Sequence, residues 1–340
     1  MHFKSVTRIE EIVNSNTKEF RELFYRIYSI RSCVGELILP KKIEKWAREK
    51  FGNCEKQKIV RLTNKISGES TLFNELRAKR PFDAKSDFSI KVEDCAFCDP
   101  ENRTPSDTFG RVIGKHCLTA SNIAKYDCIH AVVVFKEHDP FVRSKEVIED
   151  IFSVTQKWIN KANKNNPTAK YPFFMWNCLW KAGASIVHGH AQILLSEEMY
   201  SKPLQFRRIR DEYKIKYSSD YLEDISYIHE TLGLGKKYGN VKVLAYLTPI
   251  KEKEILMISD DFMSLADPLH KVLNAYYSMG VKSFNVAVYM PPIDEKDLYI
   301  LRIVDRGNIS NKTSDIGGME LYAGVSVVSS DPFVLARKLN

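Results

Sequence analysis

The stretch Trp180–Leu195, WKAGASIVHGHAQILL, places two histidines one residue apart between a loop of small residues and an apolar run. Successive side chains of a β-strand point to opposite faces, so His188, His190 and Gln192 share one face of the predicted strand. The glycine and alanine between them lie on the other face and permit close packing behind it. An isolated His-x-His pair is more often structural than functional, so its meaning depends on the residues that accompany it.

The chain of 340 residues is long enough for two domains or one large duplicated domain. Its composition, 44% hydrophobic and 28% charged, is that of a soluble globular protein. No apolar run approaches the roughly 18 residues of a membrane helix. The N-terminal segment lacks the pattern of a secretory signal, which predicts a cytoplasmic location. Seven cysteines do not suggest a disulfide framework, so we expect any ordered role for them to be metal binding.

The formal net charge of +8 suggests an anionic partner. The basic residues are spread along the chain, in runs such as 42–50 and 205–216 that also carry acidic and aromatic residues. Solvated helix faces explain such runs better than a nucleic-acid surface does. Phosphorylated small molecules fit the charge equally well. We therefore expect neither a nucleic acid nor a membrane as partner.

The first part of the chain changes its pattern at about Ile59. Residues 17–51 have apolar positions at helical spacing and predict two helices of an N-terminal extension. After Ile59 the pattern becomes one of strands with a central helix. The predicted elements are a hairpin over 59–74, a strand over 128–138, a helix over 145–163, and strands over 171–180 and 185–195.

The second part of the chain repeats this order without repeating its residues. Residues 241–259 predict two strands, 263–281 a helix, and 283–292 and 297–307 two further strands. The repetition predicts an α+β fold in which helices pack on a mainly antiparallel sheet. Four regions follow from it: a helical N-terminal extension (1–58), a first module (59–200), a charged helical linker (201–238) and a second module (239–340).

A CxxC turn at Cys95 and Cys98 can present two thiolates to one metal ion. In a reduced chain it indicates a structural zinc site, a redox pair or a chance spacing. A tetrahedral site needs two further ligands. His138 and His188 could supply them, and His130, at the other end of the strand before His138, is the alternative to His138.

Upstream of the cysteines, Arg77 and Arg80 lie in the segment LRAKRPFD. A guanidinium group can bind two phosphate oxygens at once, which a lysine does less well. When this segment is taken alone, exposed surface arginines explain it better than a phosphate-binding loop does.

Four segments in this order, RAKRPFD, CAFCDPENRTP, HAVVVFKEHDP and GASIVHGHAQILL, resemble the galactose-1-phosphate uridylyltransferase family. This family is the nucleotidyltransferase branch of the histidine-triad superfamily. The C-terminal GGMELYAGVSVVSSDPFVLARKL is also similar, so the resemblance extends from about Leu72 to Leu339. The first seventy residues lie outside it.

The resemblance implies two histidine-triad-like modules and a double-displacement reaction on a nucleotide sugar and a sugar phosphate. His190 matches the histidine that becomes nucleotidylated, and Gln192 and Ser185 match residues that contact the phosphoryl oxygens. A structural zinc would be held by Cys95, Cys98, His138 and His188.

Four further residues match substrate-binding positions of the family. Arg77 and Arg80 match a phosphate-binding loop and Asn122 a residue that binds ribose. Glu320 matches a glutamate that holds hexose hydroxyls, although a role in capping the loop after Gly318 explains it as well. Family members often form homodimers, but the sequence alone does not decide whether this chain does so.

The sequence departs from the family pattern at two places. The second module has YILRIVDR where relatives often carry a histidine pair, so we expect no second metal, and this form is closer to ADP-glucose phosphorylases of the plant type. Gly189 stands where most relatives have proline. A phosphorylase of ADP-glucose or diadenosine polyphosphate, a zinc-binding module without catalysis and a nucleic-acid-binding protein are the alternatives to a uridylyltransferase-like enzyme.

Overall fold

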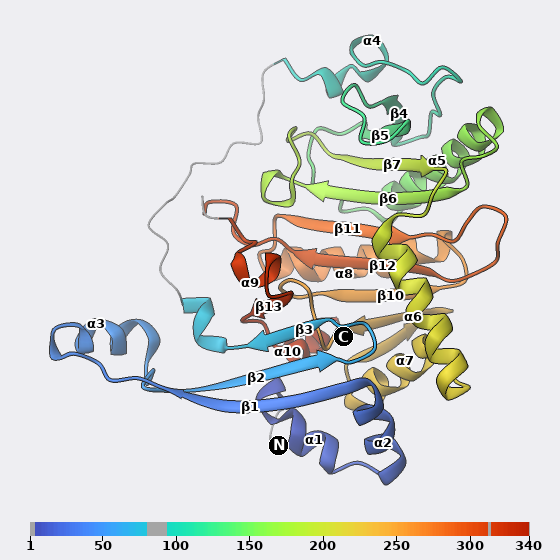
Figure 1. Cartoon of the computed structure of the whole chain (residues 1–340). Coiled ribbons are helices and arrows are strands. Elements are labelled where there is room, and N and C mark those ends of the chain that lie inside the picture. Colours follow the sequence, from blue (N-terminus) through green and yellow to red (C-terminus); the bar gives the residue numbers. More distant parts are fainter. Residues whose placement is uncertain (1–3, 80–93, 312–313, 340) are drawn as a thin grey trace.

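A computed structural model describes residues 4–79, 94–311 and 314–339 (Figure 1). The fold is α+β and contains a nine-stranded sheet and a four-stranded sheet. The large sheet is antiparallel throughout, with the order β4-β5-β7-β6-β11-β12-β10-β9-β8. The predicted fold class is therefore confirmed.

The first half of the large sheet consists of two strands, a long helix and two more strands. These elements are β4 (Cys117–Ser121), β5 (Ile129–Phe135), α5 (Lys145–Asn165), β6 (Tyr171–Cys178) and β7 (His190–Ser196). The second half has the same sequence of elements: β9 (Val241–Ala245), β10 (Ile255–Ser259), α8 (Ala266–Ser278), β11 (Phe284–Tyr289) and β12 (Tyr299–Asp305). The order within the first half, β4-β5-β7-β6, recurs as β9-β10-β12-β11. The two halves join where β6 pairs with β11, so the topology is duplicated.

The core of the molecule lies between the large sheet and the helices α5 and α8, which cover its far face in Figure 1. Alternation along the strands explains why. Ala191, Ile193 and Leu195 of β7 are buried in this core, whereas His190 and Gln192 point to the other face. On α5, apolar residues at helical spacing such as Ile151 and Trp158 meet the sheet.

The four-stranded sheet covers the outer face of the second half. It has the order β1-β2-β3-β13, with β1 (Tyr28–Glu36), β2 (Lys56–Asn64), β3 (Ser70–Phe73) and β13 (Val325–Val328). Thr71 donates a hydrogen bond to the carbonyl of Pro249 at 2.9 Å, and Asn64 donates to the hydroxyl of Tyr221 at 2.7 Å. These buried polar contacts fix the small sheet against the second half.

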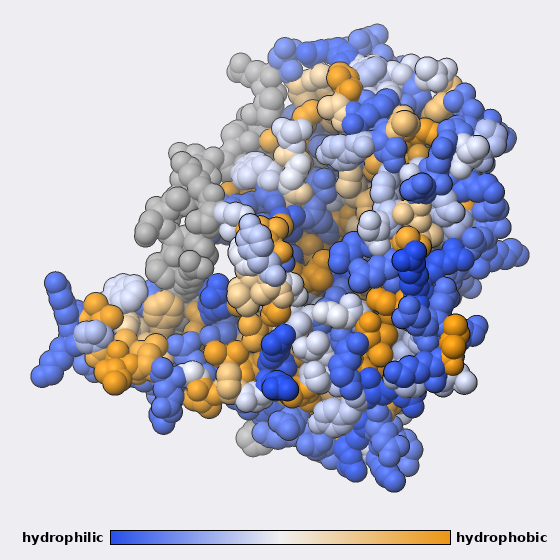
Figure 2. Space-filling view, viewed as in Figure 1, coloured by the Kyte–Doolittle hydropathy of each residue, from blue (hydrophilic) through white to orange (hydrophobic). Residues whose placement is uncertain are grey.

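The remaining helices lie around the two sheets. They are α1 (Ile9–Asn14), α2 (Lys18–Ile27), α3 (Lys41–Phe51), α4 (Pro100–Arg103), α6 (Ser201–Tyr217), α7 (Tyr221–Leu232), α9 (Gly318–Leu321) and α10 (Pro332–Lys338). Helix α3 projects from the body, and apolar side chains gather around it in the space-filling view (Figure 2). Within the described ranges, no helix has the length and apolar character needed to cross a membrane.

The N-terminal extension is not purely helical, contrary to expectation. Helix α2 ends at Ile27, and Tyr28–Glu36 form β1, which pairs with β2 along its whole length. Apolar positions at helical spacing run into Tyr28 and Ile30, so the helical pattern conceals the start of the strand. Strands β4, β13 and β8 (Gly235–Tyr238) are also absent from the sequence prediction.

Candidate active site

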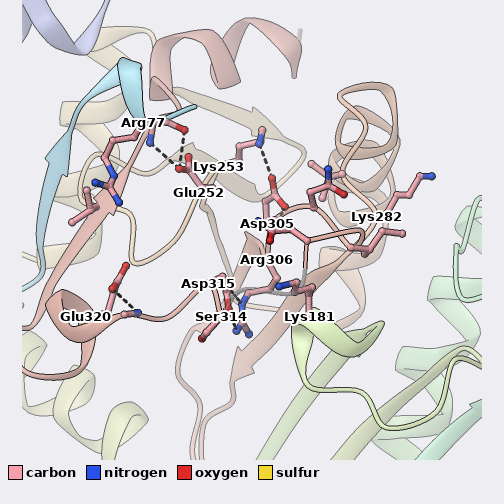
Figure 3. Close-up of a pocket in the computed structure, with 18 of the residues that line it drawn as sticks. Arg77, Lys181, Glu252, Lys253, Lys282, Asp305, Arg306, Ser314, Asp315 and Glu320 are labelled. Carbon is pink, nitrogen blue, oxygen red and sulfur yellow. Dashed lines mark hydrogen bonds and ion pairs between the residues drawn. The ribbon is translucent and has the colours of Figure 1, made fainter. Parts of the chain in front are cut away.

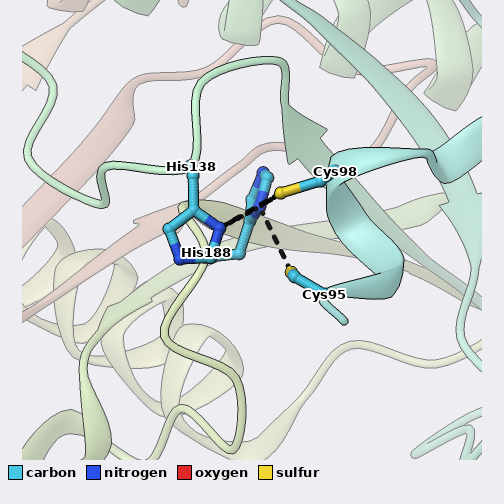
Figure 4. A group of neighbouring side chains, drawn as sticks. All are labelled: Cys95, Cys98, His138 and His188. Atoms are coloured by element: carbon cyan, nitrogen blue, oxygen red, sulfur yellow. Dashed lines mark hydrogen bonds between the residues drawn. The ribbon is translucent and has the colours of Figure 1, made fainter. Parts of the chain in front are cut away.

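Two cysteines and two histidines from distant parts of the chain lie together near the end of β5 and the start of β7 (Figure 4). Their ligand atoms all lie within 4.8 Å of one another. Sγ of Cys98 is 3.2 Å from Nδ1 of His138 and 3.6 Å from Nδ1 of His188. Sγ of Cys95 is 3.5 Å from Nδ1 of His188, and the two Nδ1 atoms are 3.2 Å apart.

These separations fit the coordination of a zinc ion. Zinc–sulfur bonds of about 2.3 Å and zinc–nitrogen bonds of about 2.0 Å place tetrahedral donor atoms about 3.3 to 3.8 Å apart. His188 is also in the required tautomer, because its Nε2 donates to the carbonyl of Phe135 at 2.7 Å and leaves Nδ1 free to bind a metal. The structure thus brings the four predicted ligands together. His130, the alternative to His138, lies elsewhere.

Gly189, between the two histidines, lies close against the ring of Phe135. A Cβ atom at this position would lie 2.5 Å from the ring of Phe135. Its N–H also donates to the carbonyl of His138 at 3.4 Å, and its carbonyl accepts from the N–H of Phe135 at 3.0 Å. Glycine therefore allows the histidine strand to approach the end of β5 closely.

His190 is the first residue of β7 and is held in one tautomer. Its Nδ1 lies 2.8 Å from the carbonyl oxygen of His188. A carbonyl can only accept, so Nδ1 carries the hydrogen and Nε2 keeps its lone pair. Burial lowers the pKa of His190, against the opposing effect of this hydrogen bond. The ring is therefore a neutral imidazole with a nucleophilic nitrogen at pH 7.

His190 lines a cavity of about 320 Å³, which we call the His190 cavity. The ring of Phe97, from the CxxC turn, meets the His190 ring edge-on at a centroid distance of 5.4 Å and the His188 ring at 5.8 Å. Phe97 thus connects the metal-binding group to the nucleophile. The cavity also has an apolar wall formed by Ala120, Ile123, Ala124, Tyr126 and Val132.

Three other predicted site residues, Gln192, Asn122 and Ser185, line the same cavity. Gln192 is buried on the same face of β7 as His190, and its Oε1 lies 2.9 Å from Nε2 of His130. This contact is not foreseen from the sequence, where His130 is considered only as a metal ligand. The alternation of β5 contains the signal, because it places His130 on the face of Val132 and Val134 rather than in the helix-facing core.

Arg77 and Glu320 line a different cavity of about 840 Å³, which we call the Glu320 cavity (Figure 3). Oε1 of Glu320 is 3.4 Å from Nζ of Lys251, and its Oε2 accepts from the N–H of Gly317 at 3.0 Å. Glu320 therefore caps α9, as its alternative interpretation requires. Arg80 lies outside the described residues.

The Glu320 cavity is rich in paired charges. Arg306 binds the carboxylate of Asp315 through two nitrogens, at 2.6 and 2.9 Å, and Lys253 pairs with Asp305 at 2.6 Å. Among the residues that the structure describes, the two cavities have no lining residue in common. The structure therefore divides the predicted site residues into one group around His190 and another around Glu320.

Comparison with solved structures shows the fold class directly. The fold is similar to that of an ADP-glucose phosphorylase from Arabidopsis thaliana, determined with bound ADP-glucose, at a TM-score of 0.63 and 17% identity. It is equally similar to a GalT-like protein from the same plant, with a TM-score of 0.62 and 17% identity. Both alignments cover 82% of this chain and 97% of the other.

A uridylyltransferase structure has a TM-score of 0.59 at 16% identity, covering 83% of this chain and 97% of the other. No protein-family model matches the chain, and no curated protein matches its sequence. The protein thus has the fold shared by these phosphorylase, GalT-like and uridylyltransferase structures, as the motif resemblance predicts. At these identities the comparison establishes the fold alone.

Proposed function

We propose that the protein is a nucleotidyltransferase that exchanges a nucleoside monophosphate between a nucleoside diphosphate sugar and a sugar 1-phosphate. One observation carries the proposal. His190 is neutral, and its Nδ1–H donates to the carbonyl of His188. Its Nε2 therefore keeps the lone pair that would attack a substrate in the His190 cavity. Covalent catalysis by such an imidazole divides one difficult transfer into two easier steps.

In the first step, Nε2 of His190 attacks the α-phosphorus of the donor. An N–P bond forms, the bond from the α-phosphorus to the bridging oxygen breaks, and its electron pair leaves with the sugar 1-phosphate. In the second step, a phosphate oxygen of the acceptor attacks the same phosphorus and His190 leaves as a neutral imidazole. The energy of the N–P bond keeps the exchange reversible.

We assign substrate-binding roles to the other residues of the His190 cavity from their positions. Gln192 and Ser185 would donate hydrogen bonds to the phosphoryl oxygens, and Asn122 would bind the ribose. The apolar wall around Tyr126 and Ile123 suits a flat nucleobase.

We further propose that Cys95, Cys98, His138 and His188 hold a structural zinc ion. Four protein ligands leave no open position for a substrate, so the ion would stabilise the CxxC turn and the segment before β7. Elemental analysis should give about one zinc per chain. A metal-free preparation that stays folded and fully active would contradict this assignment. All seven cysteines are unpaired, which agrees with the reducing cytoplasm that we propose as the location.

Glu320 can bind the hexose only if it reaches the sugar of a donor bound at His190. Since Glu320 and His190 line separate cavities, we propose that a second copy of the chain brings Glu320 and Arg77 to the donor bound at His190. The protein would then act as a homodimer. Its molar mass in solution, measured by light scattering with and without nucleotide sugar, tests this arrangement, and a strictly monomeric active enzyme would contradict it.

The second candidate is a phosphorylase of ADP-glucose, in which inorganic phosphate accepts the nucleotide. The similarity of the fold to the Arabidopsis thaliana ADP-glucose phosphorylase supports it, as does the YILRIVDR segment of β12. Both reactions require the same nucleotidyl-histidine, so the two candidates differ only in the acceptor.

Intact-protein mass spectrometry after mixing with a donor alone tests the shared step. UDP-glucose, ADP-glucose and diadenosine tetraphosphate each serve as donor, with galactose 1-phosphate or inorganic phosphate as acceptor in parallel turnover assays. The expected result is an acid-labile nucleotide adduct on His190. H190G should lose the adduct and at least about 10⁴-fold in turnover, with partial rescue by free imidazole. Full activity of H190G would refute the mechanism.

A further inference from the structure

His130, on β5, is completely buried behind Gln192 of the neighbouring strand. Nε2 of His130 lies 2.9 Å from Oε1 of Gln192. The role proposed above for Gln192 requires its amide N–H groups to point at a phosphate. A glutamine side chain can be turned by half a rotation at no steric cost, and this would present its oxygen instead.

A backbone group settles which nitrogen of His130 carries the hydrogen. The N–H of Tyr126 points at Nδ1 of His130 at 3.0 Å. A backbone N–H can only donate, so Nδ1 accepts and Nε2 is protonated. Nε2–H therefore donates to Oε1 of Gln192, and the NH₂ group of Gln192 is left to face the cavity. The orientation of the Gln192 amide is thus set by the backbone N–H of Tyr126.

The surrounding loop holds His130 in this position. The ring of Tyr126 lies over the His130 ring with a centroid distance of 4.6 Å, and Nζ of Lys125 donates to the carbonyl of His130 at 2.9 Å. Oδ1 of Asn122 accepts from the N–H of Ala124, which turns its Nδ2 toward His130 at 3.3 Å. Because Nε2 of His130 is a donor in this tautomer, its contact with Nδ2 of Asn122 joins two donors and is not a hydrogen bond.

We propose that His130 is a positioning residue for nucleotidyl transfer, because its bond to Oε1 makes Gln192 present N–H donors to the phosphoryl group attacked by His190. The inference rests on the proposed function. Negative charge grows on the non-bridging oxygens as the N–P bond forms, so a donor in this place stabilises the transition state. The reversed amide would place its own oxygen against that charge.

Two substitutions separate this role from simple packing. H130F fills the site but has no donor, and H130Q restores an amide N–H near the place of Nε2. The single-turnover rate of His190 nucleotidylation should fall about 10²-fold in H130F, the scale of losing one such donor, with a smaller change in KM. H130Q should recover most of that rate.

A double-mutant cycle gives the sharper test. If His130 acts through Gln192, H130F should cost less than about twofold in a Q192L background. Additive losses would overturn the inference. H229Q is the matched control, since His229 is equally buried and also accepts a backbone N–H, that of Leu247 at 3.1 Å. Its rate per folded molecule should equal that of the wild type.

Nitrogen-15 NMR of histidine-labelled protein tests the geometry without activity. His130 should show a protonated Nε2 and an unprotonated Nδ1. An adduct that forms in a protein whose His130 carries its hydrogen on Nδ1 would overturn this inference and leave the proposed function intact. A wild-type protein that forms no adduct with any donor would overturn both.

Discussion

The two halves of the large sheet share one strand order but differ in what lies on the face away from α5 and α8. In the first half, His190 and Gln192 of β7 face a cavity. In the second half, Arg302 of β12 lies on the equivalent face beneath the four-stranded sheet. It donates to Glu254 of the adjoining segment and to Glu69 of the β2–β3 hairpin, each at 2.6 Å. The same topology thus carries a cavity lined by His190 where the face is open and an interface where it is covered.

The polar groups of the two faces differ in kind. In the first half, His190 is neutral and bonded to the carbonyl of His188, and the neutral amide of Gln192 is bonded to His130. The second half holds full charges, and Glu254 is almost completely buried. A buried charge is tolerated only with its partners in place, so the covered face should govern stability and the open face catalysis.

The largest expected effect on this contrast comes from R302M. Removing the guanidinium leaves the buried carboxylate of Glu254 without a counter-charge, which should lower the free energy of unfolding by about 3 to 5 kcal/mol. Urea unfolding at pH 7 measures it. The double variant R302M/E254Q should recover part of the loss because the buried charge is gone.

Nucleotidylation of His190 per folded molecule should be unchanged in R302M, since Arg302 is absent from the His190 cavity. A stably folded R302M protein that no longer forms the nucleotide adduct would contradict the assignment of stability to the covered face and catalysis to the open face.

A smaller effect should appear in acid, through His229 of α7. Burial lowers the pKa of His229 to about 4, whereas an unfolded histidine titrates near 6.5. Between these two pKa values the unfolded chain binds a proton at His229 and the folded protein does not. The contribution of His229 to the free energy of unfolding is therefore complete above about pH 6.5 and is lost as the pH falls toward 4. The total is roughly 3 kcal/mol.

Urea unfolding of wild type and H229Q between pH 7 and 4.5 isolates this contribution. The glutamine variant should lose less stability than the wild type over that interval, because it has no proton to bind at this position. Parallel pH profiles would show that His229 is not the group responsible.

The smallest effect is expected from E320A, which tests whether the second half takes any part in the chemistry. If Glu320 accepts hydrogen bonds from hexose hydroxyls, kcat/KM for the sugar nucleotide should fall about ten- to a hundred-fold, or roughly 1.5–3 kcal/mol. Transfer from the nucleotidylated enzyme to inorganic phosphate should change much less.

E320Q is the matched control, because its amide oxygen can still accept from Gly317 and cap α9. Equal kcat/KM values for wild type, E320A and E320Q would reduce Glu320 to a capping residue.

The sequence predicts best the elements with long regular patterns. The apolar, β-branched runs of strands such as β5 and the helical spacing of α5 and α8 are long enough to identify these elements from the residues alone. Strand β1 is hidden because its first residues continue the apolar spacing of α2. The pairing of β13 with β3 joins residues about 250 positions apart, and no local pattern encodes it.

The site was predictable where the chemistry is carried by residue type. Two thiols and two imidazoles are the side chains that zinc prefers, so their residue types alone predict a metal site. The two-residue period of a strand places His190 on the opposite face from Gly189 and Ala191. The role of His130 depends instead on the N–H of Tyr126, a backbone donor that every residue except proline possesses. The separation of Glu320 from His190 depends on how the C-terminal segment folds back, which composition does not reveal.

The pairing of β6 with β11 has a consequence for the history of the chain. Six residue pairs, Phe173–Cys178 opposite Phe284–Tyr289, close the sheet at its centre. A first half on its own would end in β6 with a row of unpaired N–H and C=O groups, which invites pairing with another chain. Two separate halves would therefore associate through this strand, at a strength set by their concentration. Fusion into one polypeptide makes that association independent of concentration, and each half can then diverge without losing its partner.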